Sequence, residues 1–474
     1  MTTKCSTPDV LERADLICPA LIACAYLALV GATLDWHGYW SDEFHTIHAV
    51  ELSWSELIAE RASRGHPPLF FLLEKMWIAL AGSGETAYRS LPMIFGLGSV
   101  LLTYVIARRE TDRRTACFAS LLLVATATQL MICQLARSYT LLQMLVTCQA
   151  ALILSKRPPT ARIWLAYALL TAAALYTHGA ALVAVPCQLL ATAVALPKKW
   201  RFVVSGILGA ALYVPFLYFF PRLEDIEFHV AWAPSATWVA VLRFPALLLF
   251  GRHLAFTPAI VQAVAAALIV GLVLLALWHG DRASFLGLQW LFAWAAAAAA
   301  GGFGIGIIHV ERYFAPALVC QVLLIAISVH RLADKRRPIA GAAAGALAAL
   351  ALLSTGLYFV LPPSTPWREM AALIEERRIS GEAVVVASPR VLATPFAHYY
   401  DGQATFLPGG TVLPEGSVFR PESVVGIWLC LREFDDEAVS LAVPADLRAR
   451  FPHVTRFVMP RGAVLHLTPV QRAP

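Results

Sequence analysis

The stretch LICPALIACAYLALVGATL, residues 16–34, runs for nineteen residues without a charged side chain. About 20 apolar residues in a helix cross the hydrocarbon core of a membrane, so this stretch predicts a spanning helix. It has no A-x-A-like cleavage site, and similar apolar runs follow it as far as about Leu361. We therefore expect a retained first helix rather than a signal peptide, in a protein that crosses the membrane many times.

The composition supports a membrane protein. Hydrophobic residues make up 59% of the 474 residues and charged residues 14%, with a mean hydropathy of +0.66. Ordinary soluble domains carry about 25% charged residues. The net charge of +6 comes from short basic clusters between apolar runs, which indicates membrane topology and not nucleic-acid binding. The nine cysteines include no C-x-x-C pair, which argues against a structural zinc site.

Lysine and arginine predict the orientation, because they accumulate in short cytoplasmic loops. Placing all the basic clusters inside, together with the N-terminus, requires residues 69–81 and 238–252 to lie along the outer surface. Residues 69–81 carry Glu74 and Lys75 at their centre, where a charge in a spanning helix costs about 2.5 to 3.5 kcal/mol. We predict about 11 crossings, with the loop 35–89 and the C-terminus outside.

The character of the sequence changes after residue 361. TPWREMAALIEERRIS, residues 365–380, has helical spacing, while EAVVVAS and VVGIWLCL are typical of buried strands. VTRFVMP followed by AVLHLTP predicts a terminal hairpin. The chain is thus expected to be mainly α: a transmembrane domain over residues 1–361, whose outer loop forms juxtamembrane helices, and a small extracytoplasmic α/β domain over residues 362–474.

The outer loop contains WSDEFHTIHAV, residues 40–50. Asp42 could take a proton from an acceptor hydroxyl as a general base. The alternative is a solvated helix start, with Ser41 as N-cap and the acids in the first turn. Asp42, His45 and His48 recur every third residue and could share one helical face. A divalent metal could bind there, and the alternative is a surface helix that faces lipid headgroups.

Three basic residues stand at the outer ends of apolar segments. His66 precedes Pro67 and Pro68, which fit the beginning of a helix, so its imidazole could contact a phosphate or simply lie in a loop. Arg137 and Arg312 follow apolar runs. An arginine near bilayer depth is often functional and its planar fork suits phosphate, while interfacial snorkelling is the alternative for both.

Two glycine-containing runs lie in apolar segments. GGFGIGIIH, residues 301–309, follows no strand, so it does not predict a dinucleotide-binding loop. We expect this run and GAAAG, residues 341–345, to provide close helix packing through small residues.

Six motifs occur along the chain in this order: SDEF, HPPLFFLLEKMW, YRSLPMIFGLGSVLLTYVIARR, CQLARSYTLL, LYTHGAAL and ERYFAPAL. Over residues 36–316 the chain resembles the GT-C superfamily of membrane glycosyltransferases, in the branch of protein O-mannosyltransferases and lipid A aminoarabinose transferases (glycosyltransferase family 39-like). The resemblance implies transfer of a hexose or pentose from a polyprenyl-phosphate donor to a lipid, protein or glycan acceptor. The reaction would take place at the outer face of the cell (inner) membrane.

The resemblance also implies roles for particular residues. It makes Asp42 the catalytic aspartate, with Glu43 completing the pair, and His66 a contact of the donor phosphate. Its arginine-tyrosine motif falls on Arg137 and Tyr139. Many relatives have an acidic residue two positions before that arginine, where this chain has Leu135.

Arg312 and Tyr313 complete the expected substrate-binding set. Cations placed where the charge of the leaving phosphate grows would lower the barrier, and Arg137 and Arg312 are suited to this. A single displacement with Asp42 as base would invert the anomeric carbon. The alternatives are a transporter or lipid flippase, for which the sequence offers no internal repeat, and a catalytically silent envelope scaffold.

Overall fold

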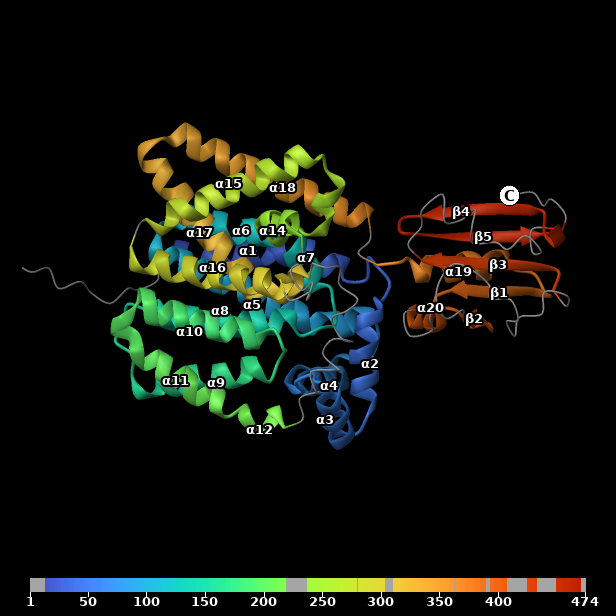
Figure 1. Cartoon of the computed structure of the whole chain (residues 1–474), viewed down its shortest axis with the longest axis horizontal. Helices are drawn as coiled ribbons and strands as arrows, with labels where there is room; N and C mark the ends of the chain where they lie inside the picture. The colour runs from blue at the N-terminus through green and yellow to red at the C-terminus, as the bar shows by residue number, and fades with distance from the viewer. Residues whose placement is uncertain are drawn as a thin grey trace, which may run out of the picture. The chain divides into compact units, whose positions relative to one another are not determined.

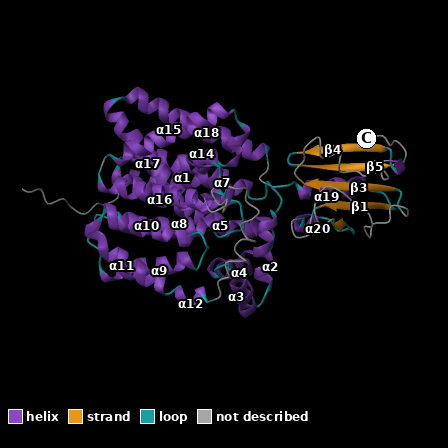
Figure 2. Ribbon diagram, viewed as in Figure 1, coloured by secondary structure: helices purple, strands orange, loops and turns teal. Residues whose placement is uncertain are grey.

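The computed structural model describes residues 13–218, 237–278, 280–302, 310–361, 364–388, 393–406, 424–432 and 449–469. The chain forms two compact units. The helical unit comprises Met1–Leu34 and Ala49–Gly356, and the sheet unit comprises Asp35–His48 and Leu357–Pro474. Figure 2 shows that the strands belong to the second unit and that the first is built of helices. Residues 35–48, which contain the acidic motif Asp42-Glu43, thus belong to the same unit as the C-terminal strands.

The helical unit is a multi-pass membrane bundle, as predicted (Figure 1). Among the residues that the structure describes, six helices are long and apolar enough to span a membrane, and a seventh span is formed if α6 and α7, bent by 62°, count as one. The expected number of about 11 crossings stays a prediction. The bounds of the longer helices are α1 Arg13–Leu29, α5 Glu85–Glu110, α6 Arg113–Val124, α7 Ala127–Cys133, α8 Tyr139–Ile153, α9 Ala161–Leu175, α10 Ala181–Ala195, α11 Trp200–Ala211, α14 Trp238–Phe250, α15 Ala259–Leu277, α16 Asp281–Gly302, α17 Ala315–Lys335 and α18 Arg337–Val360.

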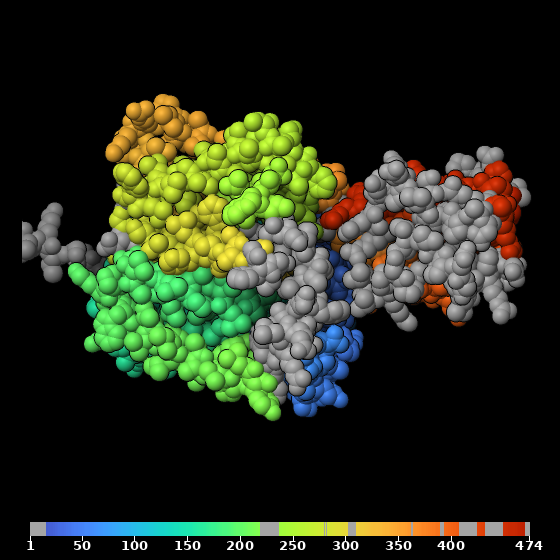
Figure 3. All heavy atoms as spheres, viewed as in Figure 1, coloured from blue at the N-terminus to red at the C-terminus, as the bar shows by residue number. Residues whose placement is uncertain are grey.

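The helix α17 forms the centre of this bundle. In the span that contains it, Glu311–Lys335, 83% of the most apolar window is buried, against at most 50% in each of the other five spans. It packs on α5, α6, α8, α15 and α16. Figure 3 shows one outer face of the helical unit with all heavy atoms drawn. The residues just before α17 are therefore held by several helices at once.

The helices α3 (Trp54–Ser63) and α4 (Leu69–Ala81) arise from the outer loop. Pro68 immediately precedes α4, as the Pro-Pro dipeptide predicts, and Gly82 ends it with a φ of 82°. At thirteen residues α4 is too short to cross a core of about 30 Å as a helix. The ammonium of Lys75 donates to the carbonyls of Val50 and Leu52, each at 2.6 Å, so its charge is bound inside the protein.

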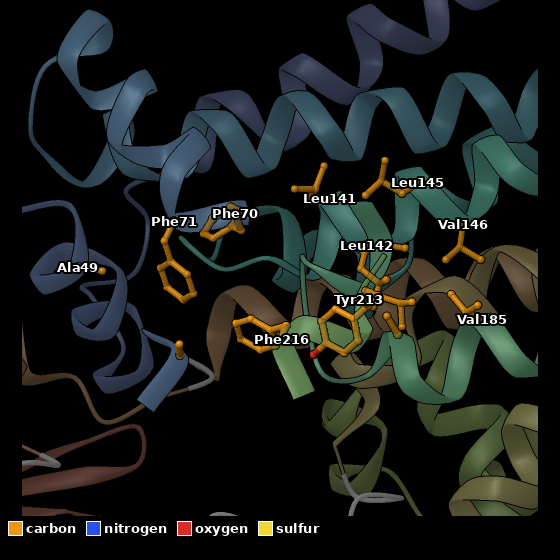
Figure 4. Packing of buried hydrophobic residues seen from close by; sticks show 14 of the residues in the cluster. Ala49, Phe70, Phe71, Leu141, Leu142, Leu145, Val146, Val185, Tyr213 and Phe216 are labelled. Carbon is orange, nitrogen blue, oxygen red and sulfur yellow. The ribbon is translucent and has the colours of Figure 1, made fainter. Parts of the chain in front are cut away.

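An apolar cluster fastens these short helices to the bundle. Figure 4 shows Phe70 and Phe71 of α4 near Leu142 of α8 and Phe216 of α12 (Val214–Leu217). The backbone N–H of Leu69 also donates to the carbonyl of Tyr176, at 2.9 Å, in the connection between α9 and α10. The start of α4 is thus fixed against the ends of α8, α9 and α10.

Small residues bring some helices together, though not those expected at residues 341–345. A Cβ on Gly209 of α11 would lie 2.2 Å from the carbonyl oxygen of Ala168 in α9, so only glycine fits there. Gly341 and Gly345 of α18 are exposed, and no atom of the described residues lies within 4 Å of a Cβ added to either. That prediction was wrong because these glycines lie on an open face of α18. Most of the run 301–309 lies outside the described residues.

The sheet unit contains the predicted small α/β domain. Its sheet has the order β2-β1-β3-β5-β4, with β1 parallel to β2 and β3, and β5 antiparallel to β3 and β4. The predicted helix, both predicted strands and the hairpin are confirmed. The elements are α19 Trp367–Arg377, β1 Glu382–Ala387, α20 Thr394–Tyr399, β2 Thr405–Phe406, β3 Gly426–Arg432, β4 His453–Met459 and β5 Gly462–Thr468.

Both faces of this sheet are covered, which explains why the sequence of β1 contains a continuous apolar run. Val384 and Val386 pack with Trp367 and Met370 of α19 on one face. Val385 packs in a separate apolar cluster on the other face. The domain therefore has its own core.

A buried carboxylate joins three parts of this domain. Glu382 accepts hydrogen bonds from Trp428 Nε1 at 2.8 Å, His466 Nε2 at 2.9 Å and the backbone N–H of Ile379 at 3.0 Å. Burial acts to raise the pKa of Glu382, but these hydrogen bonds outweigh it and the pKa lies below its usual range. A lowered folded-state pKa contributes stability above the unfolded value, and that stability is lost as the pH falls through the folded value.

We expect the C-terminal domain to become protease-sensitive when the pH falls below about 4, the ordinary range for glutamate. Glu382→Gln should weaken the domain at neutral pH and flatten this acid transition, because the amide does not titrate. Proteolysis of the full-length protein between pH 3 and 7, read at the C-terminal fragment, measures both effects. An acid transition of unchanged size in the variant would contradict the role of Glu382.

Candidate functional site

The acidic motif forms a tight turn in the sheet unit. Ser41–Glu43 make a short 3₁₀ helix that continues into α2 (Phe44–Glu51). Glu43 is fully buried, and its Oε2 accepts the backbone N–H of Trp40 at 2.8 Å. The expected N-cap, Ser41, is instead the first residue of the turn, because the glutamate reaches back to the preceding N–H. Glu43 therefore shapes the turn, whereas the side chain of Asp42 is half-buried.

The possible metal face of this motif does not form a site here. Within the described ranges, no three His, Cys, Asp or Glu side chains come together in a way that could hold a metal ion. Asp42, His45 and His48 are among the residues covered. The expectation of a divalent metal stays a prediction.

Four of the predicted substrate-binding residues lie in the helical unit at two helix starts. Arg137 lies between α7 and α8, and Tyr139 begins α8. Arg312 and Tyr313 belong to the 3₁₀ turn Glu311–Phe314 that leads into the central helix α17. Arg137, Tyr139 and Arg312 are all buried. Their positions follow from the packing of α8 against α17.

Direct contacts join the two helix starts. Arg312 Nε donates to the Tyr139 hydroxyl at 3.1 Å. The guanidinium carbon of Arg312 lies 5.7 Å from the centroid of the Tyr139 ring and 5.6 Å from that of Tyr313. The two tyrosines thus fix the plane and the position of a buried cation.

His178 completes this cluster, and sequence reasoning did not single it out as a site residue. It lies in the turn between α9 and α10, and its ring centroid is 5.1 Å from that of Tyr139 and 5.3 Å from that of Tyr313. Its Nδ1 accepts the backbone N–H of Ala180 at 3.0 Å, which leaves the proton of the neutral ring on Nε2. The available signal was a histidine within the otherwise apolar motif LYTHGAAL.

The charge around His178 is positive. Burial, together with the positive charges of Arg137 and Arg312, lowers the pKa of His178 to about 3. The imidazole is therefore neutral at physiological pH. We call Arg137, Arg312, Tyr139, Tyr313 and His178 the basic-aromatic cluster.

Arg61 is a second residue that sequence reasoning missed. It is buried on α3, forms an ion pair with Glu60, and lies over the Phe71 ring at 5.1 Å. Burial lowers its pKa, and Arg137 adds to this effect, so the two guanidinium groups influence each other. Nothing in ERASRG distinguishes Arg61 from a solvated helix residue.

His66 and Leu135 lie beside these arginines. The backbone N–H of His66 donates to the carbonyl of Arg61 at 2.8 Å, and its side chain is half-buried. The N–H of Arg137 donates to the carbonyl of Leu135 at 2.7 Å, and the Leu135 side chain is buried. The apolar side chain at position 135 thus packs inside the helical unit.

The chain is similar to known proteins in part of its sequence and in its fold. Residues 65–223 match the model of a protein family described as dolichyl-phosphate-mannose-protein mannosyltransferase. No curated protein sequence matches the chain. Three solved structures have a similar fold: ArnT from Cupriavidus metallidurans in the apo state, the same protein bound to undecaprenyl phosphate, and an oligosaccharyltransferase from Archaeoglobus fulgidus.

The similarity to ArnT extends over nearly the whole chain. The apo structure is 14% identical, with a TM-score of 0.56, over 96% of this chain and 98% of that one. The undecaprenyl phosphate complex is 14% identical, with a TM-score of 0.54, over 94% and 97%. The oligosaccharyltransferase is 15% identical, with a TM-score of 0.52, over 82% of this chain and 62% of that one.

The chain is therefore a polytopic membrane protein with the GT-C fold and a small C-terminal sheet domain. Its resemblance to the glycosyltransferase family 39-like branch, which the six ordered motifs indicate, is confirmed by the family match over residues 65–223 and by the shared fold.

Proposed function

We propose that the protein is a glycosyltransferase that moves a sugar from a polyprenyl-phosphate donor to an acceptor at the outer face of the cell membrane. The observation that carries this proposal is the basic-aromatic cluster, in which two buried arginines lie around a neutral histidine. The undecaprenyl phosphate in the similar ArnT structure supports the choice of donor. The C-terminal domain is proposed to be extracytoplasmic.

The cluster suits the phosphate of such a donor. A guanidinium binds a phosphate through two parallel N–H donors, and burial strengthens that attraction relative to water. Tyr139 and Tyr313 hold Arg312 in place, so little reorganisation is needed when charge develops. Because His178 stays neutral, its Nε2–H can donate a hydrogen bond to the same phosphate. His66 is proposed to add a further contact.

Asp42 is proposed to act as the general base. It accepts the proton of the acceptor hydroxyl as that oxygen bonds to the anomeric carbon. The bond from this carbon to the phosphate oxygen breaks in the same step, and the polyprenyl phosphate leaves with the electron pair. One displacement inverts the configuration at the anomeric carbon. Glu43 supports the reaction indirectly, since its carboxylate is used to shape the turn.

The donor class is the sharpest test of this function. We expect proteoliposomes of the purified protein to transfer radiolabelled sugar from a polyprenyl-phosphate donor, and not from a nucleotide sugar. Mass analysis of envelope glycans and lipids from cells with and without the protein identifies the sugar and the acceptor. Transfer from the nucleotide sugar alone would contradict the proposal, and lipid movement across the bilayer without a new glycosidic bond would indicate a flippase.

A further inference from the structure

Side chains of the C-terminal domain hold the backbone that leads to the acidic motif. Residues 35–40, which lead to Asp42, form no helix or strand, so their conformation depends on outside contacts. Arg368 of α19 donates to the carbonyls of Asp35 and Trp36, at 3.0 and 3.1 Å. The hydroxyl of Tyr399 in α20 accepts the backbone N–H of Tyr39 at 2.7 Å. Three hydrogen bonds to the backbone of residues 35–39 thus come from the C-terminal domain.

Packing reinforces these hydrogen bonds. A Cβ on Gly38 would lie 3.1 Å from Cβ of Arg368 and 3.3 Å from the Tyr399 hydroxyl, so the backbone passes very close to both. The Tyr39 ring is 3% exposed and lies between the rings of Phe44, His398 and Tyr399, with centroids 5.5, 5.5 and 6.4 Å away. Tyr39 is therefore an anchor, and Asp42 follows it by only three residues.

We propose that Arg368 and Tyr399 form a clamp through which the C-terminal domain positions Asp42. The inference rests on the proposed role of Asp42 as the base, and it gives the C-terminal domain a part in catalysis. Arg368 and Tyr399 are positioning residues, because they touch the backbone before the motif. A base must meet the acceptor hydroxyl within hydrogen-bonding distance, and small displacements of such groups cost much of the rate.

Removing one hydroxyl tests the clamp. Tyr399→Phe should speed hydrogen exchange of the peptide that covers residues 35–43 about three- to tenfold, the factor expected for the loss of one ordinary hydrogen bond. It should lower kcat by a similar factor and leave KM for the lipid donor unchanged, since the proposed donor contacts lie in the helical unit. Both measurements use the full-length protein in nanodiscs.

The neighbouring residue supplies a matched control. The hydroxyl of Tyr400 accepts from Arg378 at 2.8 Å, within the C-terminal domain itself. Tyr400→Phe should therefore leave exchange at residues 35–43 and kcat at the level of the unmodified protein. A second pair keeps the test independent of Tyr399: Arg368→Met should loosen the segment, and Arg368→Lys, which keeps a donor, should restore part of the rate.

Each outcome decides the proposal. Unchanged exchange in both Tyr399→Phe and Arg368→Met, faster exchange without a fall in kcat, or equal effects in Tyr399→Phe and Tyr400→Phe would overturn it. Failure of the proposed function is a separate result, because the unmodified protein would then transfer no sugar. Since the clamp as proposed serves Asp42 as the base, that result would overturn its catalytic role, while the exchange measurement would still show whether the backbone is held.

Discussion

Asp42→Asn should reduce sugar transfer by about 10²- to 10⁴-fold, the range that positioned general bases contribute. The amide keeps the size of the side chain, so the turn Ser41–Glu43 and the protein level should be preserved. Its nitrogen carries no basic lone pair, so the acceptor hydroxyl would have to lose its proton to water. Initial rates in proteoliposomes with a saturating polyprenyl-phosphate sugar measure the effect.

Two variants separate the base from its surroundings. Asp35→Asn changes an exposed carboxylate in the same segment and should transfer sugar at the normal rate. Glu43→Gln can still accept the N–H of Trp40 through its amide oxygen, so its rate should fall much less than that of Asp42→Asn. Substantial transfer by Asp42→Asn, or a larger loss in Glu43→Gln, would assign the base to another residue.

The sequence predicts most of the fold because the membrane leaves few solutions. In a membrane, the backbone groups of a long uncharged run form all their hydrogen bonds when the run is a helix. The charges of Glu74 and Lys75 mark Leu69–Ala81 as a segment that does not span. The strands of the C-terminal domain could be predicted for a similar reason, since both faces of their sheet are buried. What the pattern does not give is which face of a helix meets a neighbour, and this is why Gly341 and Gly345 were misread.

The candidate site was less predictable, because its members are distant in the sequence. Arg137 and Arg312 could each be proposed from their place at the end of an apolar run, but the contact from Arg312 to Tyr139 depends on tertiary packing. The histidine in LYTHGAAL is too weak a local pattern to predict that His178 is a site residue, and no local pattern distinguishes Arg61. The turn at Ser41–Glu43 shows the same limit. Ser41 was predicted as the N-cap, but the capping contact to the backbone N–H of Trp40 is made by Glu43, and both residue types occur in capping motifs.

The fold also suggests why Asp42 and the two arginines, Arg137 and Arg312, lie on separate parts of the chain. The cations lie at the starts of α8 and α17, where many helices hold them, and the acid lies in the segment that packs with the C-terminal domain. In the proposed function, donor binding thus depends on residues of the helical unit, and the position of Asp42 depends on contacts within the sheet unit. Variants of the two parts should then differ in kinetics: cluster variants change donor use, and clamp variants change turnover.

The largest effect on donor use is expected at Arg137 and Arg312. Arg312→Ala should lower kcat/KM for the polyprenyl-phosphate donor about 10²- to 10³-fold, the scale seen when one preorganised charge-stabilising group is removed. Arg312→Lys should lose less, because a cation remains, though it cannot reproduce the planar fork or the stacking on Tyr139 and Tyr313. Arg137→Ala and Arg137→Lys should follow the same order.

Arg109→Ala is the matched control, since this arginine donates to the carbonyl of Ala151 near the end of α8, which is the opposite end of that helix from Tyr139. Its donor use should be unchanged. Because Arg137 and Arg312 both act on His178, the double alanine variant should lose less than the product of the single losses, as groups that bind one phosphate together are not independent. Equal activity in the alanine and lysine variants, or full additivity of the two losses, would contradict a shared phosphate contact.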